Sequence, residues 1–177
     1  MKRERPASWC SAKLGDLLYS IEAGKSFRCV EKPPAHDEPG IVKVSAVTWG
    51  TFDEEESKTC PDVGRFDQKL QIRTGDLLLS RANTIELVGA CVIVGRVTKR
   101  LMLSDKILRL VMPDEMKRWV LWFLRSNHGR ARIEAQATGN QMSMRNIGQS
   151  GVRALEIPLA PIREQRRIIE AIESQVS

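Results

Sequence analysis

The chain is 177 residues long, with 42% hydrophobic and 28% charged residues, a composition that predicts one packed domain and excludes extended disorder. The net charge of +6 is unevenly placed, because residues 1–60 carry 9 basic against 10 acidic side chains, whereas residues 61–177 carry 19 against 12. Such a basic bias is typical of surfaces that contact phosphates, although a merely soluble basic surface would have the same composition.

The four cysteines and two histidines favour neither a metal site nor a disulfide framework. No two cysteines form a CxxC pair, and the histidines lie far apart, so zinc is not expected. The apolar runs are too short to span a membrane, and no apolar stretch typical of a signal peptide follows the first residues. We therefore expect a cytoplasmic protein that makes no contact with a membrane.

Turn and strand signals alternate through the first half of the chain. Gly15-Asp16 and Gly75-Asp76 each precede an apolar segment and predict two similar turns that lead into strands. Residues 31–40 contain three prolines and predict a loop. Residues 41–47 are then expected to form a strand, and residues 53–58 an acidic, solvated connector.

The second half mixes strand and helix signals. The β-branched residues 88–94 predict a buried strand, and the alternating residues 106–111 predict a half-buried one. A helix is expected from Asp114 as N-cap to just before Gly129, followed by a second short helix over residues 130–137. Trp119, Trp122 and Phe123 have the spacing of core residues on the first of these helices. A last strand is expected over residues 154–157.

A terminal helix is expected from about Ile162. Ile162, Ile169 and Val176 recur every seven residues with Ile172 between them, which is the seam of a coiled coil cut to about two heptads. This seam predicts docking on a partner helix, with folding back on the same domain as the alternative. The fold class expected from the whole pattern is α/β (α+β), with a mixed, largely antiparallel sheet, a helical pair and a protruding C-terminal helix.

Motifs for catalysis are missing from the sequence. Pro33-Pro34 lacks the neighbours of a methyltransferase base-binding motif, and no GxxxxGK[ST] loop is present for nucleotides. Asp62 and Asp67-Gln68-Lys69 have the letters of a nuclease site, but they lie too close together in sequence to come from two separate strands. We therefore expect no catalytic residue, no cofactor and no bound metal.

Several segments resemble the specificity subunits of type I restriction-modification systems. They are the opening Trp9 to Leu17, residues 75–81, residues 138–147 and residues 157–168. The last resembles the I-P-L-P-P-x-x-E-Q-x-x-I signature of that family, with Ala160 in place of a proline. The resemblance extends from Trp9 to about Ile172.

This resemblance implies a DNA target-recognition domain over residues 1–160 and the start of a spacer helix over residues 161–177. Its implied role is to bind one half of a bipartite target in double-stranded DNA and to direct partner methyltransferase and restriction subunits there. The methyl donor, ATP and magnesium would belong to those partners. The chain would be either a fragment of a two-domain subunit or a half-size subunit that associates with itself through the helix.

Base-contacting residues do not transfer by motif within this family, so the candidates are chosen by their chemistry. Arginine and asparagine are the common bidentate partners of guanine and adenine, and aromatic side chains can stack or wedge. The DNA-binding candidates are Lys25, Ser26, Phe27, Arg28, Thr48, Trp49, Arg81, Asn83, Thr84, Asn140, Gln141, Ser143 and Arg145. The alternatives are ordinary turn residues for the asparagines, a helix cap for Ser143 and a core anchor for Trp49.

Two other functions remain open from the sequence. One is a protein-protein adaptor that uses the terminal heptad helix and leaves DNA to other proteins. The other is a DNA-modifying enzyme whose site has no recognisable motif. The basic bias after residue 60 favours DNA binding over the adaptor.

Overall fold

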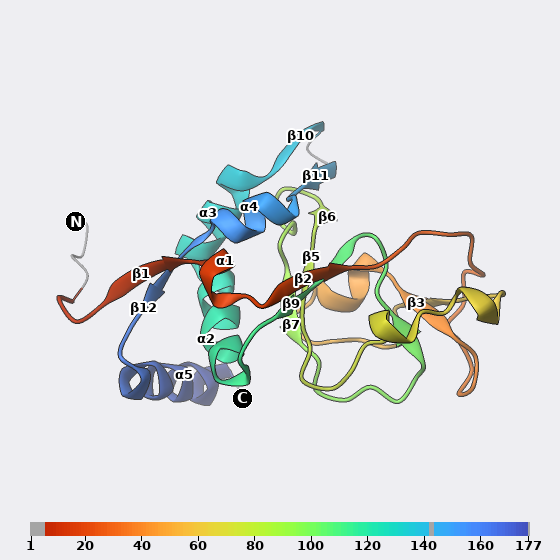
Figure 1. Ribbon diagram of the computed structural model, residues 1–177, viewed down its shortest axis with the longest axis horizontal. Coiled ribbons are helices and arrows are strands. Elements are labelled where there is room, and N and C mark those ends of the chain that lie inside the picture. The colour runs from red at the N-terminus through yellow and green to blue at the C-terminus, as the bar shows by residue number, and fades with distance from the viewer. Residues whose placement is uncertain (1–5, 142–143, 177) are drawn as a thin grey trace.

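The computed structural model describes residues 6–141 and 144–176 (Figure 1). The strands are β1 (Cys10–Lys13), β2 (Ser20–Ala23), β3 (Gly40–Val42), β4 (Ser57–Thr59), β5 (Leu77–Ser80), β6 (Ala82–Asn83), β7 (Cys91–Ile93), β8 (Leu101–Met102), β9 (Ile107–Val111), β10 (Thr138–Gln141), β11 (Met144–Asn146) and β12 (Glu156–Leu159). The helices are α1 (Leu14–Leu17), α2 (Asp114–Arg125), α3 (Asn127–Gln136), α4 (Gln149–Ala154) and α5 (Ile162–Val176), with 3-10 turns η1 (Val44–Val47), η2 (Val63–Arg65) and η3 (Gln68–Leu70).

The central sheet has four antiparallel strands in the order β2-β9-β5-β7. A second sheet places β3 between antiparallel β4 and parallel β8. Two smaller sheets pair β1 with β12 and stack β10, β11 and β6. The predicted mixed, largely antiparallel architecture is therefore confirmed.

Apolar clusters cover both faces of the central sheet. In β5, Leu77 and Leu79 belong to the larger cluster with α2 and α3, whereas Leu78 belongs to the cluster with η1 and β8. The helices lie on one side of this sheet and the β3 sheet with its long loops on the other (Figure 1). The sheet therefore separates a helical side from a loop-rich side.

Strand β9 corrects the expectation of a half-buried strand over residues 106–111. Ile107, Leu108 and Leu110 are fully buried, and Arg109 is only 8% exposed. The Arg109 side chain, whose polarity suggested a solvent-exposed face, instead pairs with Glu22 and Asp76. Both faces of the strand are therefore covered.

Two other strand predictions also need correction. Gly15-Asp16 lies within α1 rather than in a turn that leads directly into a strand, whereas Gly75, at φ +88°, does form the turn before β5. The strand expected over residues 41–47 ends at Val42, because the chain then closes the η1 turn, in which Ala46 N–H bonds the Lys43 carbonyl.

Three further segments are only partly as expected. Ser57, placed in the solvated connector, is fully buried at the start of β4, and only the latter part of residues 88–94 forms strand β7. The strand expected over residues 154–157 begins at Glu156 and continues through Pro158. The two-stranded β1-β12 sheet tolerates this proline, because a proline nitrogen can face outward at an edge.

The helical pair is confirmed as α2 and α3, but Gly129 lies inside α3 instead of after α2. Ser126 makes the corner, because its hydroxyl donates to the Phe123 carbonyl and accepts from Gly129 N–H. A Cβ atom on Gly129 would lie 2.0 Å from the Phe123 carbonyl oxygen. Only glycine fits this corner. Trp119 is 6% exposed, which confirms its core position.

Helix α5 starts at Ile162 as predicted, but it does not simply protrude. Ile169 is 5% exposed and packs in the main core, and the Gln165 amide donates to the Ala160 carbonyl at 2.8 Å. Ile162 and Val176 remain 44% and 68% exposed. The seam is therefore divided: its centre folds back on the domain, whereas its two ends are uncovered.

Candidate nucleic-acid interface

Asn83 lies where three segments distant in sequence meet. It ends β6, which pairs with β11 so that Asn83 is opposite Arg145. Its Nδ2 donates to the Thr48 hydroxyl at 3.5 Å, and that hydroxyl in turn donates to the Val44 carbonyl. Its Oδ1 accepts from Thr84 N–H at 2.9 Å. These bonds fix the amide and leave it one N–H and one oxygen lone pair for a ligand.

Trp49 lies next to this site and faces solvent. Its side chain is 74% exposed, which excludes the core-anchor alternative. The following residue, Gly50, has φ +90° and gives its carbonyl to the Arg125 guanidinium at 2.6 Å. Because Arg125 also binds the Cys91 carbonyl, the turn that carries Trp49 is tied to the end of α2. The ring is therefore an exposed aromatic on an anchored turn.

Arg81 offers a guanidinium beside Asn83. Its backbone is fixed, since its N–H donates to the Lys106 carbonyl and its own carbonyl accepts from Ile147 N–H. Its half-buried side chain has no ion pair or hydrogen bond within residues 6–141 and 144–176. The loop after Thr84 is clamped by the Arg130 guanidinium, which donates to the carbonyls of residues 85, 86 and 88. We call Thr48, Trp49, Arg81, Asn83 and Thr84 the Asn83 surface.

Arg145 has a structural role within the hairpin beside this surface. Its Nη1 donates to the Gly139 carbonyl at 2.9 Å, and its Nη2 donates to the Ala137 carbonyl at 2.7 Å. Its Nε is buried and has no partner in the described part of the chain. The guanidinium fork that would contact a base is thus already used to shape β10 and β11.

The hairpin carries the last group of sequence candidates. Asn140 and Gln141 belong to β10, and Ser143 lies outside the described residues. Because β11 pairs with both β10 and β6, the hairpin is fixed beside the Asn83 surface, and β6, β10 and β11 gather at the top of Figure 1. The fold therefore brings three of the four candidate segments together.

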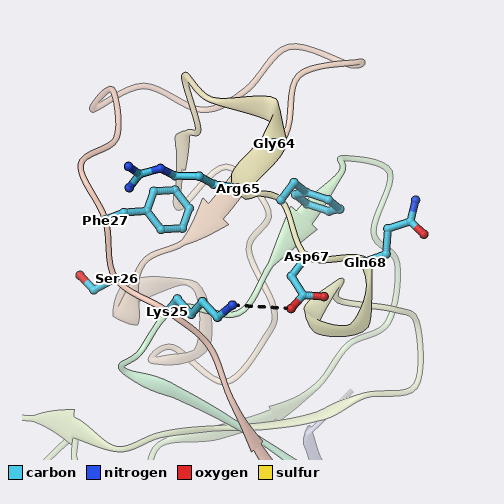
Figure 2. Close-up of a pocket in the computed structure, with 8 residues that line it drawn as sticks. Lys25, Ser26, Phe27, Gly64, Arg65, Asp67 and Gln68 are labelled. Carbon is cyan, nitrogen blue, oxygen red and sulfur yellow. Dashed lines mark ion pairs between the residues drawn. The ribbon is translucent and has the colours of Figure 1, made fainter.

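The fourth segment, residues 25–28, lies elsewhere, on the loop-rich side. With residues 64–68 it forms a hollow of about 540 Å³ (Figure 2). Lys25 Nζ is 3.9 Å from Asp67 Oδ2, and Phe27 packs in the small cluster with Ile41 and Met102. We call this the Phe27 hollow; its lining is Lys25, Ser26, Phe27, Gly64, Arg65, Phe66, Asp67 and Gln68. Arg28 is exposed next to it.

Arg65, which is not among the DNA-binding candidates expected from the sequence, projects over the Phe27 ring (Figure 2). The two carboxylates that resembled a nuclease site are helix caps: Asp62 accepts from Gly64 N–H, and Asp67 accepts from Lys69 N–H. No sequence signal could have found Arg65, because its contact with Phe27 joins segments that only the fold brings together.

The buried side chain of Arg109 bonds to the backbone next to Gln68, which lines the Phe27 hollow. Arg109 Nε donates to Glu22 at 2.7 Å, and its Nη1 reaches both Asp76 and the Gln71 carbonyl. Its Nη2 donates to the carbonyl of Lys69, the middle residue of η3. Burial disfavours the charged guanidinium, but the hydrogen bonds to Asp76 and Glu22 outweigh burial and raise the pKa of Arg109.

Comparison with known proteins decides the family. No family model matches the chain. Over 173 residues, or 96% of its length, the chain is 31% identical to the type I restriction enzyme EcoEI specificity subunit of Escherichia coli. The chain belongs to the type I specificity-subunit family. It spans 29% of the length of that curated relative.

Solved structures of this specificity-subunit family share the fold. The type I restriction-modification S subunit from M. genitalium matches 98% of this chain and 40% of its own at TM-score 0.61 and 17% identity. The HsdS subunit from Thermoanaerobacter tengcongensis matches 98% and 38% at TM-score 0.59 and 17% identity. A chain from a structure on complex assembly and conformational transition of the type I system matches 99% and 40% at TM-score 0.65 and 19% identity.

The specificity-subunit signature has a visible structural basis here. Residues 157–168 run from β12 through the turn at Pro161 into α5. The signature glutamine, Gln165, is the residue that bonds the Ala160 carbonyl, and the Trp119 indole donates to the Pro158 carbonyl at 2.7 Å. The segment thus locks the start of α5 onto α2.

Within residues 6–141 and 144–176, no three His, Cys, Asp or Glu side chains are grouped so that they could hold a metal ion. In the same part of the chain, no helix has the length and apolar character needed to cross a membrane.

Proposed function

We propose that the chain binds a specific sequence in double-stranded DNA, as one target-recognition domain of a type I specificity subunit. The observation that carries this proposal is the 31% identity over 96% of the chain to a restriction specificity subunit. Because the chain spans 29% of that relative, it would contact one half of a bipartite target. Recognition of the second half would need another domain.

The Asn83 surface is the proposed site of base contacts. Asparagine and arginine form bidentate pairs with adenine and guanine in the major groove, and Asn83 and Arg81 present both groups from one fixed strand end. Trp49 offers an exposed ring beside them for contact with a base or sugar. The contacts predicted for Asn140 and Gln141 of β10, and for Ser143, which lies outside the described residues, stay predictions within this proposal.

The Phe27 hollow is the second proposed contact. Lys25, Ser26 and Arg28 are exposed and carry hydrogen-bond donors, which suits contacts to phosphate. Phosphate contacts position a protein on the duplex, whereas base contacts specify the sequence. Two separate contact areas would fix both register and orientation.

The proposed function is non-catalytic. Partner methyltransferase subunits, and through them the restriction subunit, would modify or cut the located DNA, and they would hold the methyl donor, ATP and magnesium. The uncovered ends of α5, Ile162 and Val176, would contact a helix of a second copy or of a longer subunit. The division into residues 1–160 and 161–177, and a cytoplasmic location, stay predictions within this proposal.

Fluorescence anisotropy with labelled duplexes at 50 mM and 200 mM salt tests DNA binding. We expect binding that weakens steeply with salt, because bound phosphates release counterions. An adaptor would show no binding at either salt concentration. Incubation with plasmid, magnesium and methyl donor tests the enzyme alternative, and cleavage or methylation by the chain alone would contradict the proposal.

A further inference from the structure

Arg65 is held in place from two sides. Its Nε lies 3.4 Å from Asp62 Oδ2, one turn earlier in the chain, and its Cζ lies 5.7 Å from the centre of the Phe27 ring. The carboxylate forms an exposed ion pair at the Nε edge of the guanidinium, and the ring lies against its face, so both contacts favour one orientation of the side chain. Asp62 is itself fixed, since its other oxygen caps Gly64 N–H at 2.9 Å.

The outer edge of the same guanidinium is open. The Arg65 side chain is 59% exposed, and within the described part of the chain its two Nη groups have no hydrogen-bond partner. Figure 2 shows the guanidinium beside the Phe27 ring, on the side away from Asp67 and Gln68. By contrast, the Nη groups of Arg130 and Arg145 are bonded to backbone carbonyls.

This arrangement of donors fits the paired acceptors on the edge of a guanine base. Two parallel Nη–H donors in a fixed plane match the O6 and N7 acceptors of guanine in the major groove. Fixing the fork in advance reduces the side-chain entropy lost on binding. A phosphate also accepts two parallel N–H donors, but Lys25 and Arg28 beside the hollow already offer exposed charges for phosphate contacts.

We propose that Arg65 is a specificity-determining residue that binds a guanine in the DNA target, with Asp62 and Phe27 as its positioning residues. This proposal rests on the proposed DNA-binding function. It moves part of the base recognition to the η2 turn, 62–66, on the loop-rich side of the central sheet. Gln68, on the opposite wall of the hollow in Figure 2, would face the neighbouring base pair.

The test is selection of bound duplexes from a random pool, followed by competition binding with every single-base variant of the selected site. We expect Arg65→Ala to lose discrimination at one G·C pair by roughly 5- to 150-fold while preference at the other positions remains. Arg65→Lys keeps the charge but not the fork, so it should keep most of the affinity and lose the same discrimination.

Two further variants separate recognition from charge and from structure. Asp62→Asn keeps the cap on Gly64 but weakens the hold on Arg65, and it should reduce discrimination at the same base pair without a change in thermal midpoint. Arg28→Ala removes an exposed arginine that has no ion pair within the described part of the chain, and it should weaken binding to all duplexes alike and reduce the salt slope by about 1.

The outcomes distinguish the two proposals. If wild-type chain selects a sequence and Arg65→Ala keeps every base preference, or loses affinity for all duplexes equally, Arg65 is not a specificity residue and the proposed function stands. If wild-type chain selects no sequence at all, both proposals fail.

Discussion

The side-chain amide of Asn83 donates a hydrogen bond to the hydroxyl of Thr48, 3.5 Å away. This bond joins the end of η1 to the short strand that leaves β5, and it holds the turn of Trp49 next to Arg81. Two loops that would be independent in an extended chain thus form one surface on a fixed frame.

We predict that Arg81→Ala and Asn83→Ala impair DNA recognition more than folding. Loss of a good bidentate base contact is worth about 1–3 kcal/mol of discrimination, whereas neither side chain belongs to the core clusters. Competition binding with single-base variants measures the first effect and urea unfolding the second. Arg96→Ala is the matched control, since Arg96 is exposed beyond β7, at the opposite end of β5. Unchanged selectivity in both variants would exclude the Asn83 surface.

We predict that Arg109→Met lowers the free energy of unfolding by about 3–5 kcal/mol, because it leaves Glu22 and Asp76 without their buried partner. Arg118→Ala removes an equally well-formed pair with Glu173, but the Arg118 side chain is 53% exposed, so its loss should cost less than about 1 kcal/mol. Urea unfolding measures both. Equal costs would mean that the burial of Arg109 has no energetic consequence.

Glu54 gives the fold a component of stability that depends on pH. Burial alone would raise its pKa, but hydrogen bonds from Thr98 N–H, the Thr98 hydroxyl and Lys99 N–H outweigh burial and hold the pKa of Glu54 below its usual value. Its contribution is therefore fully present above the ordinary glutamate pKa of about 4.3 and is lost as pH falls through the lowered value.

We predict that Glu54→Gln destabilises the chain at pH 7 and that the difference from wild type shrinks as the pH falls below about 4. Guanidinium unfolding at a series of pH values from 7 to 3 measures this difference. A difference that stays constant over the whole range would show that the charge of Glu54 is not what holds the 98–99 backbone.

The buried centre and the exposed ends of the α5 seam should respond differently to substitution by a charged residue. Ile169→Glu buries a carboxylate in the main core, so we predict that it destabilises or unfolds the domain itself. The pair Ile162→Glu and Val176→Glu changes exposed side chains, and it should leave the unfolding free energy within about 1 kcal/mol of wild type. Mass measurement in solution then shows whether the exposed ends mediate self-association. A folded, stable Ile169→Glu variant would contradict the docking of α5.

The sequence predicted what local rules control. Helices α2, α3 and α5 were placed within a few residues, because apolar periodicity and caps act within one segment. The residues after Val42 were misassigned because an apolar β-branched run has the same composition in a buried 3-10 turn as in a strand. Gly129 was taken for a helix end because its actual requirement, the close approach to Phe123, is a tertiary contact.

The candidate site shows the same difference between local sequence signals and tertiary contacts. Asn83 and Arg81 were selected because arginine and asparagine in one short loop are the common bidentate partners of guanine and adenine, and their contact with DNA stays a prediction. Arg145 was chosen by residue type, yet its donors serve the carbonyls of its own hairpin. Arg65 was missed because its neighbours Asp62 and Phe27 meet only in the folded chain.

The most direct test of sequence-specific DNA binding is selection of duplexes from a random pool, followed by sequencing. The selection uses the chain together with its methyltransferase partner. We predict a short conserved half-site whose preference is lost in part on Arg81→Ala or Asn83→Ala and in another part on Arg65→Ala. Recovery of unselected sequences at a salt concentration where DNA is still bound would contradict it.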